Sequence, residues 1–281
     1  MSKSRLLESV TEQKERANLV IDSDSILFLS CYALKDTGDY EAMYVDFWMR
    51  IKTIEQKVWE DYELDKIVIA LTSKLNFRHG LTEKWKANRK DKDEKELTEK
   101  QIEAQREARQ LKDLVKEVKG LIYKRMNKAK NRTVSANNIC EADDRCIDLA
   151  HQGWLVASID SDIIKQSPSP VFDFHKKRYR WTEGNSYEDI FYSIIHETIT
   201  GGHNGKFGVA GKGKVFADKF IKQIKDGSKS LVDWVDLFPT PEEAVLNFQL
   251  IDCNQVKNNK LHLQTMESIS DMFEEVVGDV F

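Results

Sequence analysis

Short apolar runs that end at polar residues predict buried strands in the first two thirds of the chain. Residues 18–22 (NLVID) form one such run and residues 66–71 (KIVIAL) form a second. Residues 154–158 form a third, and residues 170–174 and 178–181 read as a pair of short strands. Continuous apolar runs of this length are typical of strands that are covered on both faces, as in a parallel sheet.

Helical spacing of apolar residues predicts the elements between and after these strands. Residues 40–59 and 140–150 have this spacing, and residues 96–126 contain almost no glycine or proline. The part of 96–126 that precedes residue 111 is nearly all polar, so we expect this helix to project from the body of the protein. Its apolar stripe consists of Leu111, Leu114, Val115, Val118, Leu121 and Ile122.

From residue 186 to residue 281 the chain reads as helical. Only a glycine-rich run at 200–215 and the sequence FPTP at 238–241 interrupt this pattern. Strands that alternate with helices, followed by helices alone, predict a parallel α/β layer and then a helical domain. A chain of 281 residues has room for both.

Composition favours a soluble globular protein. The chain is 41% apolar and 32% charged, with only four prolines. No run approaches about 18 apolar residues, and the polar N-terminus lacks the apolar core of a signal peptide. The four cysteines show no C-x-x-C spacing, so we expect buried, reduced thiols in a cytoplasmic protein that does not bind membranes.

The net charge of −4 hides a strong asymmetry. Residues 84–132 contain 17 Lys or Arg against nine Asp or Glu, a net charge of +8. The excess lies at the two ends: residues 84–90 carry four basic residues and 119–132 carry six, with no acid in either stretch. Such runs are often only solvated surface, but clustered positive charge at both ends of one insertion also suits a phosphate backbone.

Three groups of acids stand where predicted strands end or predicted helices begin. Because open α/β sheets place their sites beyond the carboxyl ends of the strands, these groups are candidates to converge. Like charges at short range repel, and a divalent cation such as Mg²⁺ or Mn²⁺ removes the conflict. The alternative is that each group acts separately, as a helix cap, a solvated helix start and a turn residue. The acids are Asp22, then Glu141, Asp143 and Asp144, and finally Asp160 and Asp162.

The glycine-rich run nearly matches a phosphate-binding P-loop. Gly208, Gly213 and Lys214 are in register with G-x-x-x-x-G-K-[ST]. Val215 fails the last position because it has no hydroxyl to hold a magnesium ion. A P-loop also follows a buried strand, whereas the preceding residues 191–200 read as a helix, so the P-loop interpretation is disfavoured.

Taken together, the motifs resemble one family, the bacteriophage 5′→3′ exonucleases and flap endonucleases, which are related to the 5′-nuclease domain of bacterial DNA polymerase I. The resemblance runs over most of the chain, in the family's order and spacing. It implies a PIN-like, mostly parallel α/β core in residues 1–185, with a helical arch at about 84–132. A helical domain is implied in 186–281, with a helix–three-turn–helix motif at about 195–225. The matching stretches are VID (20–22), NFRHGLTEKWKANRK (76–90), EADD (141–144), SIDSD (158–162) and GVAGKG (208–213).

The resemblance also implies roles for individual residues. Asp22, Glu141, Asp143, Asp144, Asp160 and Asp162 fall on the family's metal-site carboxylates. Lys86 and Arg89 fall on the basic pair that contacts the scissile phosphate. Trp85 falls where an aromatic ring stacks on a base, with ordinary packing as the alternative, and Lys90 extends this basic stretch. The loop residues expected to hold a DNA phosphate, often with K⁺, are Gly208, Val209, Gly211, Gly213 and Lys214.

Two departures from the family's pattern bear on the metal site. Ser73 stands where many relatives have an acid after the second strand. Gly201 and Asn204 stand where the family usually has two aspartates that complete a second metal site. Asn204 still offers a neutral oxygen, and Glu197 or His203 are candidate substitutes, although His203 also suits an ordinary loop position.

The activity implied by the resemblance is Mg²⁺- or Mn²⁺-dependent hydrolysis of DNA, or of RNA in RNA–DNA hybrids, at 5′ ends, flaps or nicks. One ion would be held firmly and a second more weakly. We expect a monomer in the cytoplasm, that of the host if the protein is phage-encoded. The missing aspartate pair supports an alternative: a DNA-structure-binding protein of the same fold with impaired cleavage.

Overall fold

The computed structural model describes residues 14–72, 81, 98–125, 132–135, 140–181, 184–201 and 208–253. Its centre is a six-stranded sheet of order β3-β2-β1-β4-β5-β6, in which every neighbouring pair is parallel except β5 and β6. The strands are β1 (Glu15–Asp22), β2 (Tyr62–Ala70), β3 (Arg132–Ser135), β4 (Leu155–Ala157), β5 (Val171–Asp173) and β6 (Arg178–Trp181). This mixed, mostly parallel α/β sheet confirms the predicted fold class.

Side chains of β1 alternate between two apolar layers, one on each face of the sheet. Leu19 and Ile21 pack in the larger layer beneath three helices, whereas Val20 points into the other layer. The alternation follows from the strand period of two residues, and the continuous apolar run at 19–21 lets this end of β1 be covered on both sides.

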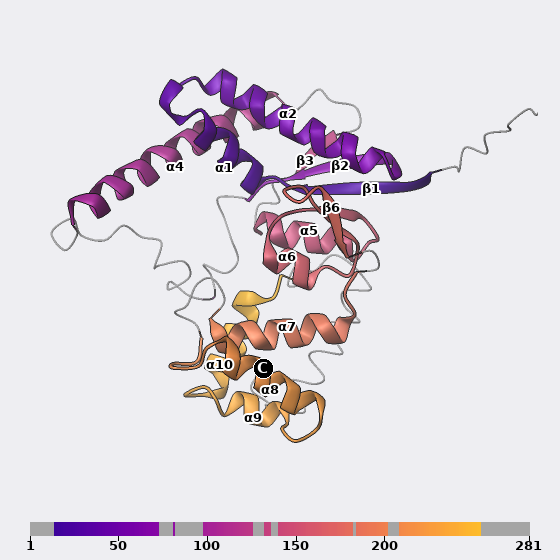
Figure 1. Ribbon diagram of the computed structural model, residues 1–281, viewed down its shortest axis with the longest axis vertical. Helices are drawn as coiled ribbons and strands as arrows, with labels where there is room; N and C mark the ends of the chain where they lie inside the picture. Colours follow the sequence, from indigo (N-terminus) through magenta and orange to yellow (C-terminus); the bar gives the residue numbers. More distant parts are fainter. Residues whose placement is uncertain are drawn as a thin grey trace, which may run out of the picture.

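Helices α1, α2 and α4 cover one face of the sheet (Figure 1), and the short 3₁₀ helix η1 lies between α1 and α2 along the chain. Asp39 caps α2, because its carboxylate accepts the backbone N–H groups of Glu41 and Ala42. The C-terminal half of α4 packs through its predicted stripe, while its N-terminal half extends away from the body (Figure 1). The bounds are α1 (Asp24–Ala33), η1 (Lys35–Thr37), α2 (Tyr40–Trp59) and α4 (Glu99–Arg125).

Helices α5 (Ala142–Ala150) and α6 (Ser161–Gln166) cover the opposite face. The remaining helices form a separate group below α6 in Figure 1, around an apolar core of their own that contains Trp234. The indole N–H of Trp234 donates to the Thr198 hydroxyl, which satisfies its one polar group. This group consists of α7 (Tyr187–Thr200), α8 (Lys214–Lys225), α9 (Leu231–Val235) and α10 (Pro241–Ile251).

Most predicted elements are confirmed, with small differences at their ends. The helix expected at 40–59 is α2, and the helix expected at 96–126 is α4. The helix α7 before the glycine run removes the structural basis of a P-loop, which would need a strand there. All four cysteines are buried and free, as expected. Helices α1 and α6 and strand β3 were not predicted.

Candidate metal centre

The first turn of α5 is built from the acidic stretch EADD. Glu141 is the N-cap residue, and the Asp144 carboxylate accepts its backbone N–H at 2.9 Å, so the two residues form a capping box. Asp144 is fully buried and Glu141 is buried, whereas Asp143, between them, is half-buried. The cap therefore leaves Asp143 as the carboxylate of this turn that is most open to a ligand.

Asp22 and Asp160 are joined through one serine. Asp22 is the last residue of β1 and is buried. The Ser158 hydroxyl donates to Asp22 Oδ2 at 2.8 Å, and Ser158 Oγ itself accepts the backbone N–H of Asp160 at 2.9 Å. Asp160 in turn is the N-cap of α6, where its carboxylate accepts the N–H of Asp162. The interpretation of Asp22 as a helix cap does not hold, because Ser23 is the N-cap of α1.

Electrostatic interactions link the carboxylates of β1, α5 and α6. Burial raises the pKa of Asp22 from its ordinary value of 3.8 to about 7, and the charges of Asp24 and Asp160 add to the rise. Burial also raises the pKa of Asp143 well above its ordinary value, with further contributions from Asp22 and Asp160. These acids therefore gather at one edge of the sheet, and their mutual repulsion is what a bound cation would remove.

The carboxylate oxygens at this edge are suitable ligands for a divalent cation, although they are not arranged as a complete metal site. Within the described ranges, no three His, Cys, Asp or Glu side chains stand together in a group that could hold a metal ion. Asp144 and Asp160 accept backbone N–H groups instead. Asp22 Oδ1, however, is buried and finds no hydrogen-bond partner in the described part of the chain. A buried acceptor without a partner is costly, and a hard cation satisfies it.

Asp24 is a further acid of this edge that the sequence did not single out. It lies in the first turn of α1, and both of its carboxylate oxygens accept the backbone N–H of Thr72, each at 3.2 Å. Its charge raises the pKa of Asp22. The spacing D-S-D was a usable signal, because it repeats the spacing of Asp160 and Asp162 after another strand.

The other predicted residues around the acids are only partly described. Asp162 lies in the first turn of α6, where its Oδ1 accepts a hydrogen bond from the Ser161 hydroxyl at 3.1 Å. The remaining predicted residues fall outside the described residues, so their roles stay predictions. They are Ser73, Trp85, Lys86, Arg89, Lys90, His203 and Asn204.

The glycine-rich loop folds back onto the end of α7. Gly208 lies so close to it that an added Cβ would stand 2.5 Å from the backbone nitrogen of Gly201. The Val209 N–H donates to the Ile199 carbonyl at 2.9 Å, and Gly211 has φ +71°, in the left-handed region. Gly213 is the N-cap of α8. The described part of the loop thus packs on the end of α7 and leads into α8, and the helix–three-turn–helix motif stays a prediction.

Lys214 opens α8 as an exposed residue, and its ammonium lies 3.1 Å from the carboxylate of Asp218. The first backbone N–H groups of a helix have no partner within the helix and favour anions. Together with the close packing of Gly208, this gives the loop the chemistry expected of a phosphate-binding turn.

One of the two departures near the end of α7, Gly201, has a structural explanation, while Asn204 lies outside the described residues. Gly201 is the C-cap of α7 with φ +80°, a conformation that favours glycine over aspartate. Glu197, a candidate substitute for the missing acids, is buried and accepts a hydrogen bond from Lys165 of α6. Its negative charge is therefore already matched by an ammonium.

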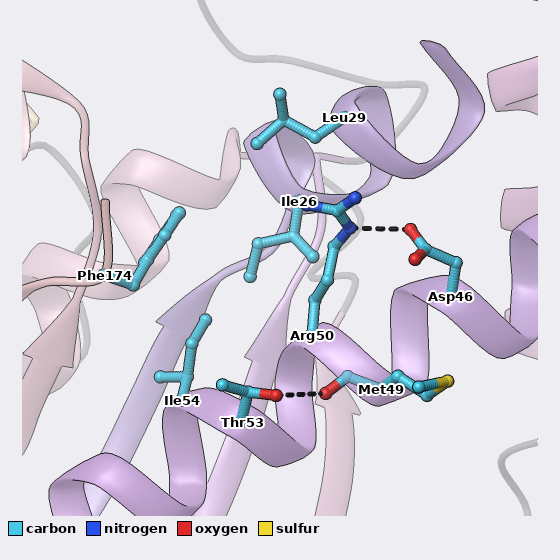
Figure 2. Close-up of a pocket in the computed structure, with 8 residues that line it drawn as sticks. All are labelled: Ile26, Leu29, Asp46, Met49, Arg50, Thr53, Ile54 and Phe174. Atoms are coloured by element: carbon cyan, nitrogen blue, oxygen red, sulfur yellow. Dashed lines mark hydrogen bonds and ion pairs between the residues drawn. The ribbon is translucent and has the colours of Figure 1, made fainter. Parts of the chain in front are cut away.

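An apolar pocket of about 290 Å³ lies away from these acids, between α1, α2 and Phe174 (Figure 2). Arg50 lies at the pocket, where its Nε donates to Asp46 at 2.6 Å. No predicted site residue lines it. None of the helices in the described part of the chain is long and apolar enough to cross a membrane.

Known proteins match this chain in three-dimensional structure but not in sequence. No protein-family model matches the sequence, and no curated protein matches it. Solved structures do match. T5 5′-exonuclease with bound divalent metal ions (zinc) is 18% identical with a TM-score of 0.56, over 92% of this chain and 100% of that chain. The T5 D15 protein co-crystallised with metal ions is 15% identical with a TM-score of 0.57, over the same shares of the two chains.

A third solved structure is a bacteriophage T5 D15 flap endonuclease in a pseudo-enzyme–product complex with DNA and metal ions. It is 18% identical with a TM-score of 0.53 and covers 92% of this chain and 99% of that chain. The resemblance inferred from the ordered motifs is therefore confirmed at the level of three-dimensional structure. This chain has the fold of the bacteriophage T5 5′-exonuclease and flap endonuclease.

Proposed function

We propose that this protein is a divalent-metal-dependent 5′→3′ exonuclease and structure-specific flap endonuclease that hydrolyses phosphodiester bonds of DNA. The observation that carries the proposal is the electrostatic interaction among Asp22 at the end of β1, Asp143 in the first turn of α5 and Asp160 at the start of α6. The buried, unsatisfied Asp22 Oδ1 supports a cation there. The shared fold with nucleases that bind metal ions and DNA adds to it.

Each acid of this edge has a proposed part in the metal site. Asp22, Glu141 and Asp143 hold the firmly bound Mg²⁺ or Mn²⁺, with Asp144 acting directly or through water. Asp160 and Asp162 lie near a second, weaker ion. When bound, divalent cations supply the positive charge that activates a water molecule for attack and stabilises the leaving oxygen.

The chain's own cationic side chains complete the proposed mechanism. Lys86 and Arg89 contact the scissile phosphate and neutralise its charge as that charge builds up. Trp85 offers a stacking surface for a base at a single-stranded 5′ end, and Lys90 adds to the positive charge on the backbone path. These roles rest on the motif at 76–90 rather than on described contacts.

The loop at 208–213 is proposed to hold a backbone phosphate of the duplex, with K⁺ as a candidate companion ion. Its support is the close approach of Gly208 to α7 and the exposed start of α8 at Lys214. Backbone N–H groups at such a turn bind phosphate without reading sequence. The proposed substrates are therefore defined by shape: DNA 5′ ends, flaps or nicks, and RNA–DNA hybrids. We propose that the protein acts as a monomer in the cytoplasm, that of the host if it is phage-encoded.

The proposal is tested with a labelled 5′-flap substrate, purified protein and Mg²⁺ or Mn²⁺. We expect metal-dependent cleavage that falls by more than about a hundredfold in Asp143→Asn, because a carboxylate ligand is lost. Asp113→Asn, which changes an exposed acid of α4, is the matched control and should keep full activity. Circular dichroism of both variants verifies that they fold.

A second function is favoured by one observation: a left-handed glycine, Gly201, stands where the family usually has an aspartate. The alternative is a DNA-structure-binding protein with impaired cleavage. Tight binding of the flap substrate with no metal-dependent cut at any tested protein concentration would favour this alternative and contradict the nuclease proposal.

A further inference from the structure

Thr72, two residues beyond the end of β2, contacts three helices at once. Its N–H donates to both carboxylate oxygens of Asp24 in the first turn of α1. Its hydroxyl accepts the N–H of Ala142, the first residue of α5, at 2.9 Å. Its carbonyl accepts a hydrogen bond from Lys119 of α4. One residue therefore connects the starts of α1 and α5 to the C-terminal half of α4.

Lys119 adds an ion pair to this connection. Its ammonium lies 3.7 Å from Asp24 Oδ1, and its side chain is 22% exposed. The sequence placed Lys119 at the start of the second basic stretch, where we expected contact with phosphate. In the structure it turns inward, and the fully buried Val118 and Ile122 of α4 anchor the helix on either side of it.

The connection lies beside the candidate metal centre, because Asp24 acts on Asp22 and Ala142 adjoins Asp143. Along the chain, Thr72 comes shortly before the motif at 76–90 and α4 comes after it. Ala142, held by Thr72, directly precedes Asp143. A shift of α4 at Lys119 would thus be transmitted to the turn that carries Asp143.

We propose that Lys119, Asp24 and Thr72 form a clasp that fixes the first turn of α5, and with it Asp143, relative to α4. They are positioning residues: they act through Asp143 and do not touch substrate. The effect of the clasp on cleavage rests on the proposed nuclease function, whereas its effect on the α5 turn does not.

The two charged members allow the clasp to be separated from a general charge effect. Removing the positive charge of Lys119 should strengthen Mn²⁺ binding, and removing the negative charge of Asp24 should weaken it, because the charge of Asp24 acts on Asp22 and Lys119 lies 3.7 Å from Asp24. Loss of positioning should instead lower kcat in both variants. A clasp therefore predicts that the two variants change Mn²⁺ affinity in opposite directions while kcat falls in both.

The experiment compares Lys119→Met, Asp24→Asn and the conservative Lys119→Arg with wild type, using the full chain. Lys116→Met is the matched control, since Lys116 is an exposed residue of the same helix. The readouts are hydrogen–deuterium exchange of the peptide that contains Ala142, Mn²⁺ affinity by calorimetry, and kcat and KM on a 5′-flap. We expect faster exchange at Ala142 and a kcat lower by about 10- to 100-fold in Lys119→Met and Asp24→Asn. Lys119→Arg should keep the exchange rate at Ala142 and the kcat close to those of wild type.

The outcomes separate the clasp from the proposed function. If wild type does not cleave but Lys119→Met still speeds exchange at Ala142, the nuclease proposal fails and the clasp stands. Unchanged exchange in folded Lys119→Met and Asp24→Asn overturns the clasp, whatever happens to kcat. A lower kcat with unchanged exchange would assign Lys119 a direct electrostatic role instead.

Discussion

At the scale of single residues, Asp22 shows why a bound cation would stabilise the edge of the sheet where β1 ends. One of its oxygens accepts a hydrogen bond from Ser158, while the other is buried with no partner in the described part of the chain. Its pKa is raised mainly by burial and then by neighbouring acids. An isolated buried carboxylate is destabilising, but next to Asp143 the same group suits the ligand role for a hard ion that we propose for it.

The raised pKa of Asp22 predicts how the metal-free protein responds to pH. The folded state keeps a proton on Asp22 up to about pH 7, whereas the unfolded chain releases it near the ordinary value of 3.8. Because the folded state binds more protons in this window, its stability should fall as pH rises from about 4 to about 7. We expect the melting temperature in EDTA to fall less steeply for Asp22→Asn than for wild type. Added Mn²⁺ should restore wild type at pH 7.5 but not the variant.

Calorimetric scans between pH 5 and 8 measure this difference. Asp113→Asn serves as the control and should follow wild type. Parallel curves for wild type and Asp22→Asn would contradict the assignment of the titrating group.

The acids at strand ends could be predicted from sequence, because a buried strand that closes on an acid fixes where the acid lies. Asp24 was missed, because an acid in the first turn of a helix is ordinary and only the D-S-D spacing that it shares with Asp160 and Asp162 marks it. Gly201 also escaped prediction. The family's sequence pattern marks Gly201 only as a missing aspartate. Its left-handed backbone follows from its place as the C-cap of α7, which the sequence did not fix.

At the scale of elements, the glycine-rich loop depends on one close approach rather than on all its glycines. Gly208 lies against Gly201 and Thr200, whereas a Cβ added at Gly213 would meet nothing within 4 Å. An added Cβ should therefore displace the loop at Gly208 and leave it unchanged at Gly213.

We expect Gly208→Ala to displace the loop, lower the melting temperature and weaken binding of a DNA duplex by about tenfold or more, since loop phosphate contacts depend on backbone placement. Gly213→Ala, the matched control, should bind DNA like wild type. Fluorescence anisotropy with a labelled duplex, together with thermal melts, measures both effects. Equal binding by the two variants would exclude the loop as a phosphate-binding site.

Elements with a clear period were predictable and the others were not. Helix α2 has a regular apolar face and a capping aspartate, Asp39, and its bounds matched the expected range. Helix α1 is apolar on nearly all sides, with Phe28 and Tyr32 about half exposed, so it lacks the amphipathic signal. Strand β3 has the sequence RTVS, with a single apolar residue, so it lacks the apolar or aromatic residues that marked the other short strands.

At the scale of the whole molecule, α6 joins the acidic edge to the helical part. Asp160 caps its start, Lys165 pairs with Glu197 of α7, and the Gln166 amide oxygen accepts the N–H of Cys253 beyond α10. Apolar packing adds to this, because Cys253 also lies in the layer beneath α5 and α6. The glycine loop is therefore held at a fixed place relative to the carboxylates.

This arrangement predicts binding to the DNA backbone rather than to a sequence. Affinity should fall steeply with salt, with a slope of about −0.9 per phosphate neutralised. Lys214→Ala should reduce the slope by about 1 and weaken binding equally for duplexes of different sequence. Lys57→Ala, which alters a half-buried lysine of α2 paired with Glu60, is the control. A marked sequence preference, or no change of slope in Lys214→Ala, would argue against backbone binding by this loop.

The most direct measurement of the central claim is anomalous diffraction from a crystal of the protein soaked in MnCl₂. We predict a manganese peak among Asp22, Asp143 and Asp160, with a second, weaker peak towards Asp162, and loss of the first peak in Asp143→Asn. Absence of any peak at this edge of the sheet, or peaks only at unrelated surfaces, would contradict the account.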